Sequence, residues 1–201
     1  GALRPAVRVK VLTPSHWPDV ETLFGVKGAC AGCWCMFWRL KVGERFDDVK
    51  GATAKRRFKA LVMSGKAQGL LAYVGEEPVG WLAMGPRRSF PKLDRAPSLA
   101  CADADEVHSL PCFFIKTAHR GRGVATALLN ASVLALKEAG ARTIEGYPVQ
   151  PTKPGSKIPA AFAYTGTLSL FQKAGFSVAE GRAKGKQRVR LDAQSRLPKR
   201  R

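Results

Sequence analysis

The residues best suited to bind an anion form a short basic loop in the middle of the chain. Arg120, Gly121, Arg122 and Gly123 stand between an apolar run and a helical pattern. The first backbone N–H groups of a helix have no intrahelical partner and carry the positive end of its dipole. Glycine lets a ligand approach the backbone closely, and the arginines add positive charge. The spacing therefore predicts a phosphate or pyrophosphate site at a helix N-terminus. The alternative is a tight turn that uses glycine only for its geometry.

Two common phosphate motifs are excluded. The chain has no G-x-x-x-x-G-K-[ST] sequence, and Thr126 stands where a dinucleotide fingerprint needs its third glycine. The pattern that remains, Arg120-x-x-Gly123-x-Ala125, resembles the acetyl-CoA motif Q/R-x-x-G-x-G/A of the GNAT acyltransferases. A Leu-Phe-x-x-x-Gly-Phe sequence over residues 170–176 also resembles this family. The two motifs together make a stronger resemblance than either alone.

The GNAT resemblance covers roughly residues 6–192 and implies both a fold and a reaction. The fold would be a mixed α/β one, with helices flanking a central, twisted, mostly antiparallel sheet of about seven strands in the order βααβββαβαββ. The reaction would be acetyl-CoA-dependent N-acetyl transfer, with acetyl-CoA as cosubstrate and direct transfer to an amine in a ternary complex. The residues implied in acetyl-CoA binding are Phe113, Phe114, Ile115, Arg120, Gly121, Arg122, Gly123, Val124, Ala125 and Thr126.

The groups that would move protons depart from the family pattern. Many GNAT enzymes carry a tyrosine general acid where this chain has Phe171, which cannot donate a proton. Tyr164 and Tyr147 are the candidates to replace it, and water is the alternative. A histidine can titrate near neutral pH and so can serve as a base. The candidate bases are His108, Glu106 and Glu145, with bulk water again as the alternative.

Residues 28–39 hold an unusual concentration of soft and aromatic side chains, including three cysteines and two tryptophans. In the GNAT fold, the region between the first two helices commonly lines the acceptor side. The resemblance therefore implies that Trp34, Cys35 and Arg39 contact the acceptor. The alternative is that this segment fills the core between two helices. The acceptor amine is not identified by the sequence, although a strongly basic chain disfavours a polycation unless the pocket is locally acidic.

The elements expected to position these residues follow from hydrophobic periodicity and turn residues. A 3.6-residue period from Val124 to Leu136 predicts the helix after the basic loop, and Gly140 is suited to end it. Residues 85–105 contain three prolines and are expected to form a long loop that could act as a lid. The other predicted elements are strands at 7–11, 70–74, 79–84, 106–115, 141–149, 176–180 and 188–191, and helices near 17–24, from Asp47 or Asp48 to Gly65, and in the second half of 163–176.

Composition is typical of a globular protein. The 201 residues are 45% hydrophobic and 24% charged. We expect one domain over residues 1–201, with a basic tail from about residue 193. No apolar run is long enough to span a membrane and no signal peptide is evident, so a cytoplasmic protein with reduced cysteines is expected. Cys30-x-x-Cys33 has a zinc-like spacing but lacks a second ligand pair, so no metal is expected.

The net charge of +19 favours polyanionic partners, such as the phosphates of CoA, nucleic acid or an acidic substrate. Two alternatives to an acetyltransferase follow. The first is an acyl-CoA-binding module of the same fold without turnover, suggested by Phe171. The second is a basic nucleic-acid-binding protein, although no helix-turn-helix or RNA-binding aromatic signature stands out. No membrane partner is expected. GNAT domains are often dimeric, so the resemblance also implies that a homodimer can form.

Overall fold

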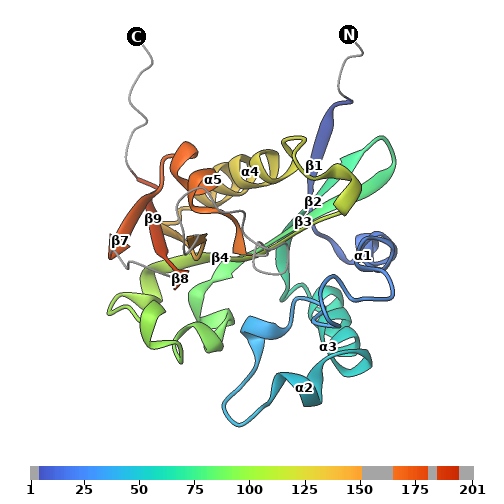
Figure 1. Ribbon diagram of the computed structural model, residues 1–201, viewed down its shortest axis with the longest axis horizontal. Coiled ribbons are helices and arrows are strands. Elements are labelled where there is room, and N and C mark those ends of the chain that lie inside the picture. The colour runs from blue at the N-terminus through green and yellow to red at the C-terminus, as the bar shows by residue number, and fades with distance from the viewer. Residues whose placement is uncertain (1–4, 151–164, 181–184, 195–201) are drawn as a thin grey trace.

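The computed structural model describes residues 5–150, 165–180 and 185–194. Its centre is a seven-stranded sheet in the order β1-β2-β3-β4-β5-β9-β7 (Figure 1). The β4–β5 pair is parallel and the other neighbours in this sheet are antiparallel. The predicted mixed α/β fold with a mostly antiparallel sheet is therefore confirmed. The strands are β1 Val7–Val11, β2 Gln68–Val74, β3 Glu77–Pro86, β4 Val107–Ile115, β5 Thr143–Gly146, β7 Ser177–Glu180 and β9 Arg188–Asp192.

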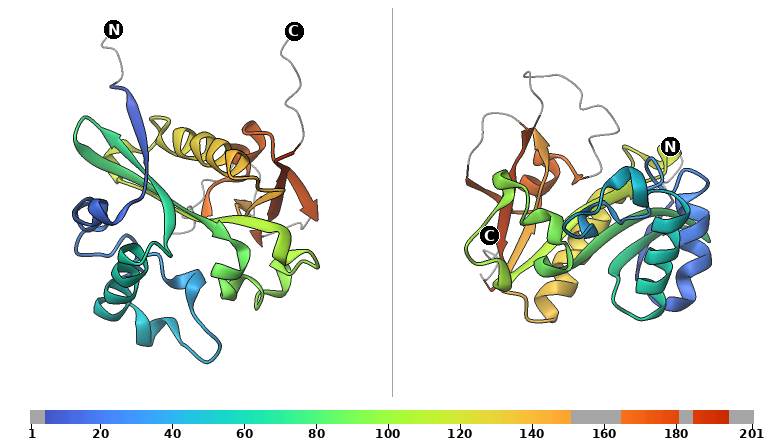
Figure 2. Two further views of the ribbon diagram at one scale, coloured as in Figure 1. Left: turned by 180° about the vertical axis from the view of Figure 1, so that it is seen from behind. Right: turned by 90° about the horizontal axis from the view of Figure 1, so that it is seen from below.

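Helices cover both faces of this sheet (Figures 1 and 2). One face carries α4 (Val124–Glu138) and α5 (Leu168–Lys173), and the other carries α1 (Trp17–Phe24), α2 (Phe46–Val49) and α3 (Ala52–Met63). Two neighbouring residues of β3 show how the two faces are covered, because successive side chains of a strand point to opposite faces of the sheet. Trp81 packs against Phe24 and Phe58, whereas Leu82 belongs to the apolar cluster of α4. Within the described ranges, no helix combines the length and apolar composition needed to cross a bilayer.

The helix predicted after the basic loop is confirmed. Its buried positions are Val124, Leu128, Leu129, Ser132 and Leu136, which form one stripe at helical spacing. Gly140 follows the helix with a φ of +84°, the left-handed conformation that ends helices without steric cost.

Three predicted boundaries are wrong. The helix expected from Asp47 or Asp48 to Gly65 is divided into α2 and α3, because Gly51 between them has a φ of +86°. The strand expected at 141–149 ends at Gly146, and Pro148, which has no N–H for a ladder, separates β5 from a short strand β6 (Val149–Gln150). β6 pairs with β8 (Gly185–Lys186) in a two-stranded ribbon. Glu106 closes a 3-10 turn and precedes β4.

Residues 85–105, expected to form a long loop, pack as a wall of short turns beside the sheet. Most of the segment is a series of single 3-10 turns, and it buries Phe90, Leu93 and Leu99 together with Tyr147. It lies on the same side of the sheet as α2 and α3 (Figure 2). The three prolines stand at the starts of these turns, where their fixed φ suits the first residues of a helical turn.

The central strand β4 separates from β5 halfway along its length. It pairs with β5 over residues 107–110 and then continues to Ile115 alongside β3, without a β5 partner among the described residues. The register with β3 shifts at the same place, where Leu110 and Pro111 lie opposite the single residue Met84. Such a bulge bends a strand and increases its twist. Within the described residues, the second half of β4 therefore has no strand on this edge, and the edge leads directly into the basic loop.

Candidate active site

The open half of β4 directs backbone polar groups away from β3. Lys116 donates its N–H to the Val79 carbonyl at 2.9 Å, which fixes the alternation of hydrogen-bonded pairs between the two strands. By this alternation, the backbone N–H and C=O of Phe114 point toward β3. Those of Phe113 and Ile115 point to the opposite edge of β4, where β5 no longer pairs with it. An extended ligand that carries amides can pair with such an edge as an added strand would.

The loop after β4 leads into the uncapped N-terminus of α4. Gly121 and Gly123 have φ angles of +71° and +82°, and a Cβ at either position would meet nothing within 4 Å. Gly123 is the N-cap residue, no described side chain caps the helix, and its first turn has no acidic residue. Open approach, unpaired N–H groups and the positive end of the dipole are the features of an anion site.

Two arginines beside this helix start add positive charge. Arg120 and Arg122 are both exposed, and Arg120 donates its Nε–H to the Ile115 carbonyl at 3.1 Å. Neither arginine forms an ion pair within the part of the chain that the structure describes. Lys116, by contrast, lies 3.0 Å from Glu77. The two arginines are therefore positioned to face the phosphates of a ligand.

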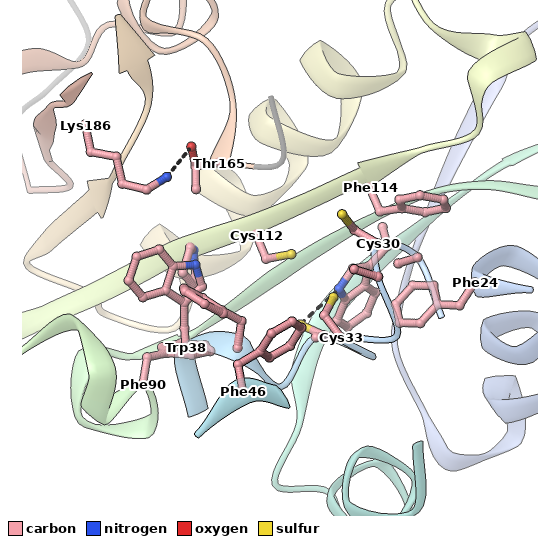
Figure 3. A pocket seen from close by; sticks show the side chains of 16 residues that line it. Phe24, Cys30, Cys33, Trp38, Phe46, Phe90, Cys112, Phe114, Thr165 and Lys186 are labelled. Atoms are coloured by element: carbon pink, nitrogen blue, oxygen red, sulfur yellow. Dashed lines mark hydrogen bonds between the residues drawn. The ribbon is translucent and has the colours of Figure 1, made fainter. Parts of the chain in front are cut away.

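A pocket of about 340 Å³ lies beside β4 on the face that carries α1, α2 and α3 (Figure 3). Its walls are mainly aromatic. Phe24 and Phe114 lie toward one end, and Trp38 and Phe90 toward the other (Figure 3). A pocket of this size, apolar and with few polar groups, is suited to a small ligand.

One wall of the pocket is a cysteine-bearing segment with an unusual backbone. Four non-glycine residues have positive φ angles between 46° and 69°: Ala29, Ala31, Trp34 and Cys35. Each such conformation costs roughly 1–3 kcal/mol, and residues of this kind gather at functional sites. The strained backbone aims Cys30, Cys33 and Cys35 at the pocket, while the Trp34 ring packs in the core.

The surroundings of Cys35 favour ionisation of its thiol. Trp81 donates its indole N–H to Cys35 Sγ at 3.4 Å. A hydrogen bond from Cys112, the charge of Arg39 and this indole together lower the pKa of Cys35 from 9.0 to about 7, although burial opposes them. The same contact raises the pKa of Cys112 well above 9.0, and burial raises that of Cys33 to about 11. Near neutral pH, the pocket wall therefore carries a partly ionised thiol at Cys35.

The other end of the pocket is polar (Figure 3). Lys186 in β8 donates its ammonium to the Thr165 hydroxyl at 3.3 Å and lies 5.6 Å from the centre of the Trp38 ring. Burial lowers the pKa of Lys186. Among the described lining residues, these two side chains supply the only hydroxyl and the only cation.

The predicted acceptor contacts divide between the pocket and the core. Cys35 lines the pocket. Trp34 does not, because its ring is buried against Trp17. Arg39 lies behind the wall with its guanidinium 4.5 Å from the centre of the Phe90 ring, and its buried Nε has no hydrogen-bond partner among the described residues. Residues 28–39 therefore both line the pocket and fill the core.

The predicted bases Glu106, just before β4, and His108, in β4, lie away from this pocket. Glu106 is exposed and its carboxylate is 3.9 Å from Arg142. His108 alternates onto the same face as Leu110 and Ile144, which packs against α4. Burial lowers the pKa of His108. Since the pocket lies on the opposite face, neither placement favours a role as the base.

Tyr147 belongs to a buried polar network. Its hydroxyl donates to Glu145 at 2.8 Å and lies 2.6 Å from the Ser109 hydroxyl, and burial raises its pKa well above 10.0. Glu145 is completely buried and accepts hydrogen bonds from three arginines: Arg87, Arg188 and Arg190. These contacts do not favour Tyr147 as the general acid or Glu145 as the base. Tyr164 lies outside the described residues, directly before Thr165.

Phe171 is a core residue. It is completely buried in α5 and packs edge-on against Phe113 and Phe176. A Cβ on Gly146 would collide with the Phe171 ring, so the close approach needs glycine there. The position at which the resemblance implies a tyrosine general acid therefore holds a hydrocarbon in the core.

Among the lining residues that sequence reasoning missed, Cys112, Thr165 and Lys186 carry a thiol, a hydroxyl and an ammonium. A signal existed for Cys112, because it lies two residues before Phe114 and so shares its face of β4. No comparable signal marked Lys186. It is one of many basic residues, and its place depends on the pairing of β8 with β6. Within the described parts of the chain, His, Cys, Asp and Glu side chains form no group of three that could hold a metal ion.

The sequence of this chain matches one protein-family model. The model described as "Acetyltransferase (GNAT) family" matches residues 35–154. No curated protein sequence matches the chain.

Solved structures share the fold at low sequence identity. An N-acetyltransferase from Staphylococcus aureus Mu50 is 12% identical with a TM-score of 0.56, over 94% of this chain and 99% of that one. The PaiA N-acetyltransferase from Thermoplasma acidophilum, in complex with coenzyme A, is 13% identical with a TM-score of 0.55, over 93% and 99%. The putative acetyltransferase YncA from Salmonella typhimurium, with its cofactor acetyl-CoA, is 13% identical with a TM-score of 0.54, over 96% and 97%.

Proposed function

Because the chain belongs to the GNAT acetyltransferase family, we propose that it transfers the acetyl group of acetyl-CoA to an amine. The observation that carries the proposal is the order of features along β4. A strand edge with no described neighbour runs into a helix N-terminus that no described side chain caps. Two exposed arginines without a described ion pair flank this helix start, and a small pocket lies beside the same strand. This order fits a long cosubstrate with an amide-bearing arm and a pyrophosphate, and it leaves room for a separate acceptor.

In this proposal, pantetheine pairs with the backbone of Phe113 and Ile115, and the pyrophosphate lies over residues 120–126. Two of the solved neighbours carry coenzyme A or acetyl-CoA, which supports this assignment. The N–H of Ile115 is directed away from β3 and is the candidate donor to the oxyanion that forms on the thioester carbonyl. Holding thioester and amine together supplies proximity, a large part of catalysis in direct transfer.

Proton transfer is assigned to the pocket wall. The amine must lose a proton before or during attack, and a base with a pKa near the working pH is the most effective. The partly ionised Cys35 meets that requirement, and it lines the pocket. Tyr164 remains the candidate acid toward the CoA thiolate, because it directly precedes the pocket residue Thr165.

Calorimetric titration with acetyl-CoA tests the cofactor site. We expect a dissociation constant in the micromolar range and a loss of about tenfold or more, roughly 1.4 kcal/mol, in the Arg122→Glu variant. The matched control is Arg56→Glu, which makes the same charge change at an exposed position of α3. It should bind acetyl-CoA as the wild type does. An absence of binding at millimolar acetyl-CoA, or equal losses in both variants, would overturn the assignment.

A further inference from the structure

The ammonium group of Lys186 lies at the pocket, and no described carboxylate lies beside it to balance its charge. The residue is half-buried, its ammonium donates to Thr165, and it forms no ion pair within the described parts of the chain. No Asp or Glu is among the described lining residues, and the sequence of residues 151–164 and 181–184 contains neither. At this end of the pocket the ammonium therefore has no described carboxylate beside it, and an anionic ligand group is the partner that it lacks.

Burial makes this arrangement costly when the pocket is empty. Moving an ammonium out of water disfavours its charged form, and the pKa of Lys186 is lowered for that reason. A hydroxyl offsets only part of the lost hydration. A ligand carboxylate at the Lys186 ammonium would offset much more, since a hydrogen bond between two charged groups is stronger than a neutral one.

The remaining surface of the pocket defines the rest of the acceptor. Its walls are aromatic rings and thiols, and its volume is about 340 Å³, near the lower end of ordinary ligand pockets. The Trp38 ring lies beside Lys186, so an apolar group attached near a carboxylate would contact it. A polyamine or aminoglycoside would place several cations in a basic, apolar cavity with no carboxylate to receive them.

We propose that the acceptor is an apolar α-amino acid, held by its carboxylate on Lys186 and Thr165 and by its side chain against the aromatic wall. The inference rests on the proposed acetyl transfer and names the substrate class of that reaction. In the step itself, the amine nitrogen forms a bond to the acetyl carbonyl carbon and the bond from that carbon to the CoA sulfur breaks. The acceptor ammonium gives up two protons. One passes through the base to solvent and the other is taken up by the departing CoA sulfur, so the products are an N-acetyl amino acid, CoA and one proton.

Binding of reaction products tests the carboxylate contact without needing turnover. The probes are N-acetyl-tryptophan and N-acetyltryptamine, which differ only in the carboxylate, titrated into the full chain saturated with CoA. We expect N-acetyl-tryptophan to bind at least tenfold more tightly. The Lys186→Met variant should lose most of that preference, whereas Lys186→Arg should keep it. Lys92→Met is the matched control, because its ammonium stacks on the Phe37 ring and does not line the pocket.

Turnover then separates failure of the inference from failure of the proposed function. With acetyl-CoA present, tryptophan, leucine, tryptamine and spermidine are compared by CoA release. Tryptophan and leucine should be the better acceptors, and Lys186→Met should shift the preference toward tryptamine. Faster reaction of tryptamine or spermidine in the wild type would overturn the inference and leave the acetyltransferase intact. A preference for N-acetyl-tryptophan that survives in Lys186→Met would also overturn it, whereas failure to bind acetyl-CoA would defeat the proposed function itself.

Discussion

Cys35 brings three features together in one wall of the pocket. Its backbone has a φ of +59°. Its sulfur accepts hydrogen bonds from the Trp81 indole and from the Cys112 thiol. A non-glycine residue in the left-handed region carries a conformational cost, which the surrounding packing must outweigh. These features support a chemical role for Cys35 beyond lining the acceptor pocket.

Titration of the thiolate by its ultraviolet absorbance tests this role. The difference between the wild type and Cys35→Ser should show one thiolate forming with a midpoint near pH 7. Cys101→Ser is the control, because burial raises the pKa of Cys101 and its removal should leave the signal near neutral pH unchanged. A Cys35 difference that appears only at pH 9 or above would contradict the assignment.

The same titration predicts the sign of a pH effect on catalysis. A base acts in its deprotonated form, so acetyl transfer should rise as the pH increases through about 7 and fall as Cys35 is protonated below it. Cys35→Ser should have a lower rate at pH 8 and should lose this dependence. An unchanged profile in the variant would assign the proton to water or to another group.

The candidate binding and catalytic residues were only partly predictable from the sequence. The basic loop was recognisable because its function depends on local sequence alone. Gly121 and Gly123 allow close approach at a helix N-terminus, and the arginines beside them add charge. The interactions of Cys35 were not, since Trp81 and Cys112 reach it from distant strands. His108 and Glu106 looked suitable by type, but strand alternation and exposure place both away from the pocket.

Among the elements, β5 and β9 are joined to the 85–105 segment by a buried ionic network. Glu145 in β5 contacts Arg188 and Arg190 from β9 and Arg87 from that segment, and Arg190 also forms two hydrogen bonds of 2.6 and 2.8 Å with Asp103. This network holds the wall beside Phe90 against the sheet. It is therefore a support for the acceptor pocket rather than part of its lining.

Replacing Glu145 by Gln should destabilise the protein strongly. The change keeps the shape of the side chain and removes the charge that three guanidinium groups face, and breaking a buried pair in this way costs about 3–5 kcal/mol. We expect the melting temperature to fall by roughly 10 °C in calorimetry.

The control for this change is Glu106→Gln. Its carboxylate is exposed and lies 3.9 Å from Arg142, so the melting temperature should stay within measurement error. Equal effects of the two substitutions would show that the buried network contributes no more than a surface ion pair.

The order of elements was predictable, and their finer boundaries were not. Apolar periodicity gave α4, which buries one regular face, and continuous apolar runs gave the hairpin of β2 and β3, whose strands are buried on both faces. The division of α2 from α3 depends on the left-handed Gly51, and the packing of residues 85–105 depends on contacts with Tyr147 and β9. Both are tertiary effects that no local pattern expresses.

At the scale of the whole molecule, charge and architecture favour an anionic cosubstrate. The chain has 34 Lys and Arg against 15 Asp and Glu, which gives a net charge of +19. Such an excess attracts anions such as the phosphates of CoA and speeds their encounter at low salt. Among the described basic residues near the start of α4, Lys116 and His119 contact Glu77, and Arg120 and Arg122 have no acidic partner.

Amine-dependent release of CoA from acetyl-CoA tests the central claim most directly. CoA is quantified by chromatography, because the five cysteines of the chain would react with thiol reagents. We predict release that requires both the protein and an amine acceptor, with the KM for acetyl-CoA raised at least tenfold in Arg122→Glu and unchanged in Arg56→Glu. Acetyl-CoA binding without amine-dependent release, across amino acids, aryl amines and polyamines, would contradict the account and identify a binding module of the same fold.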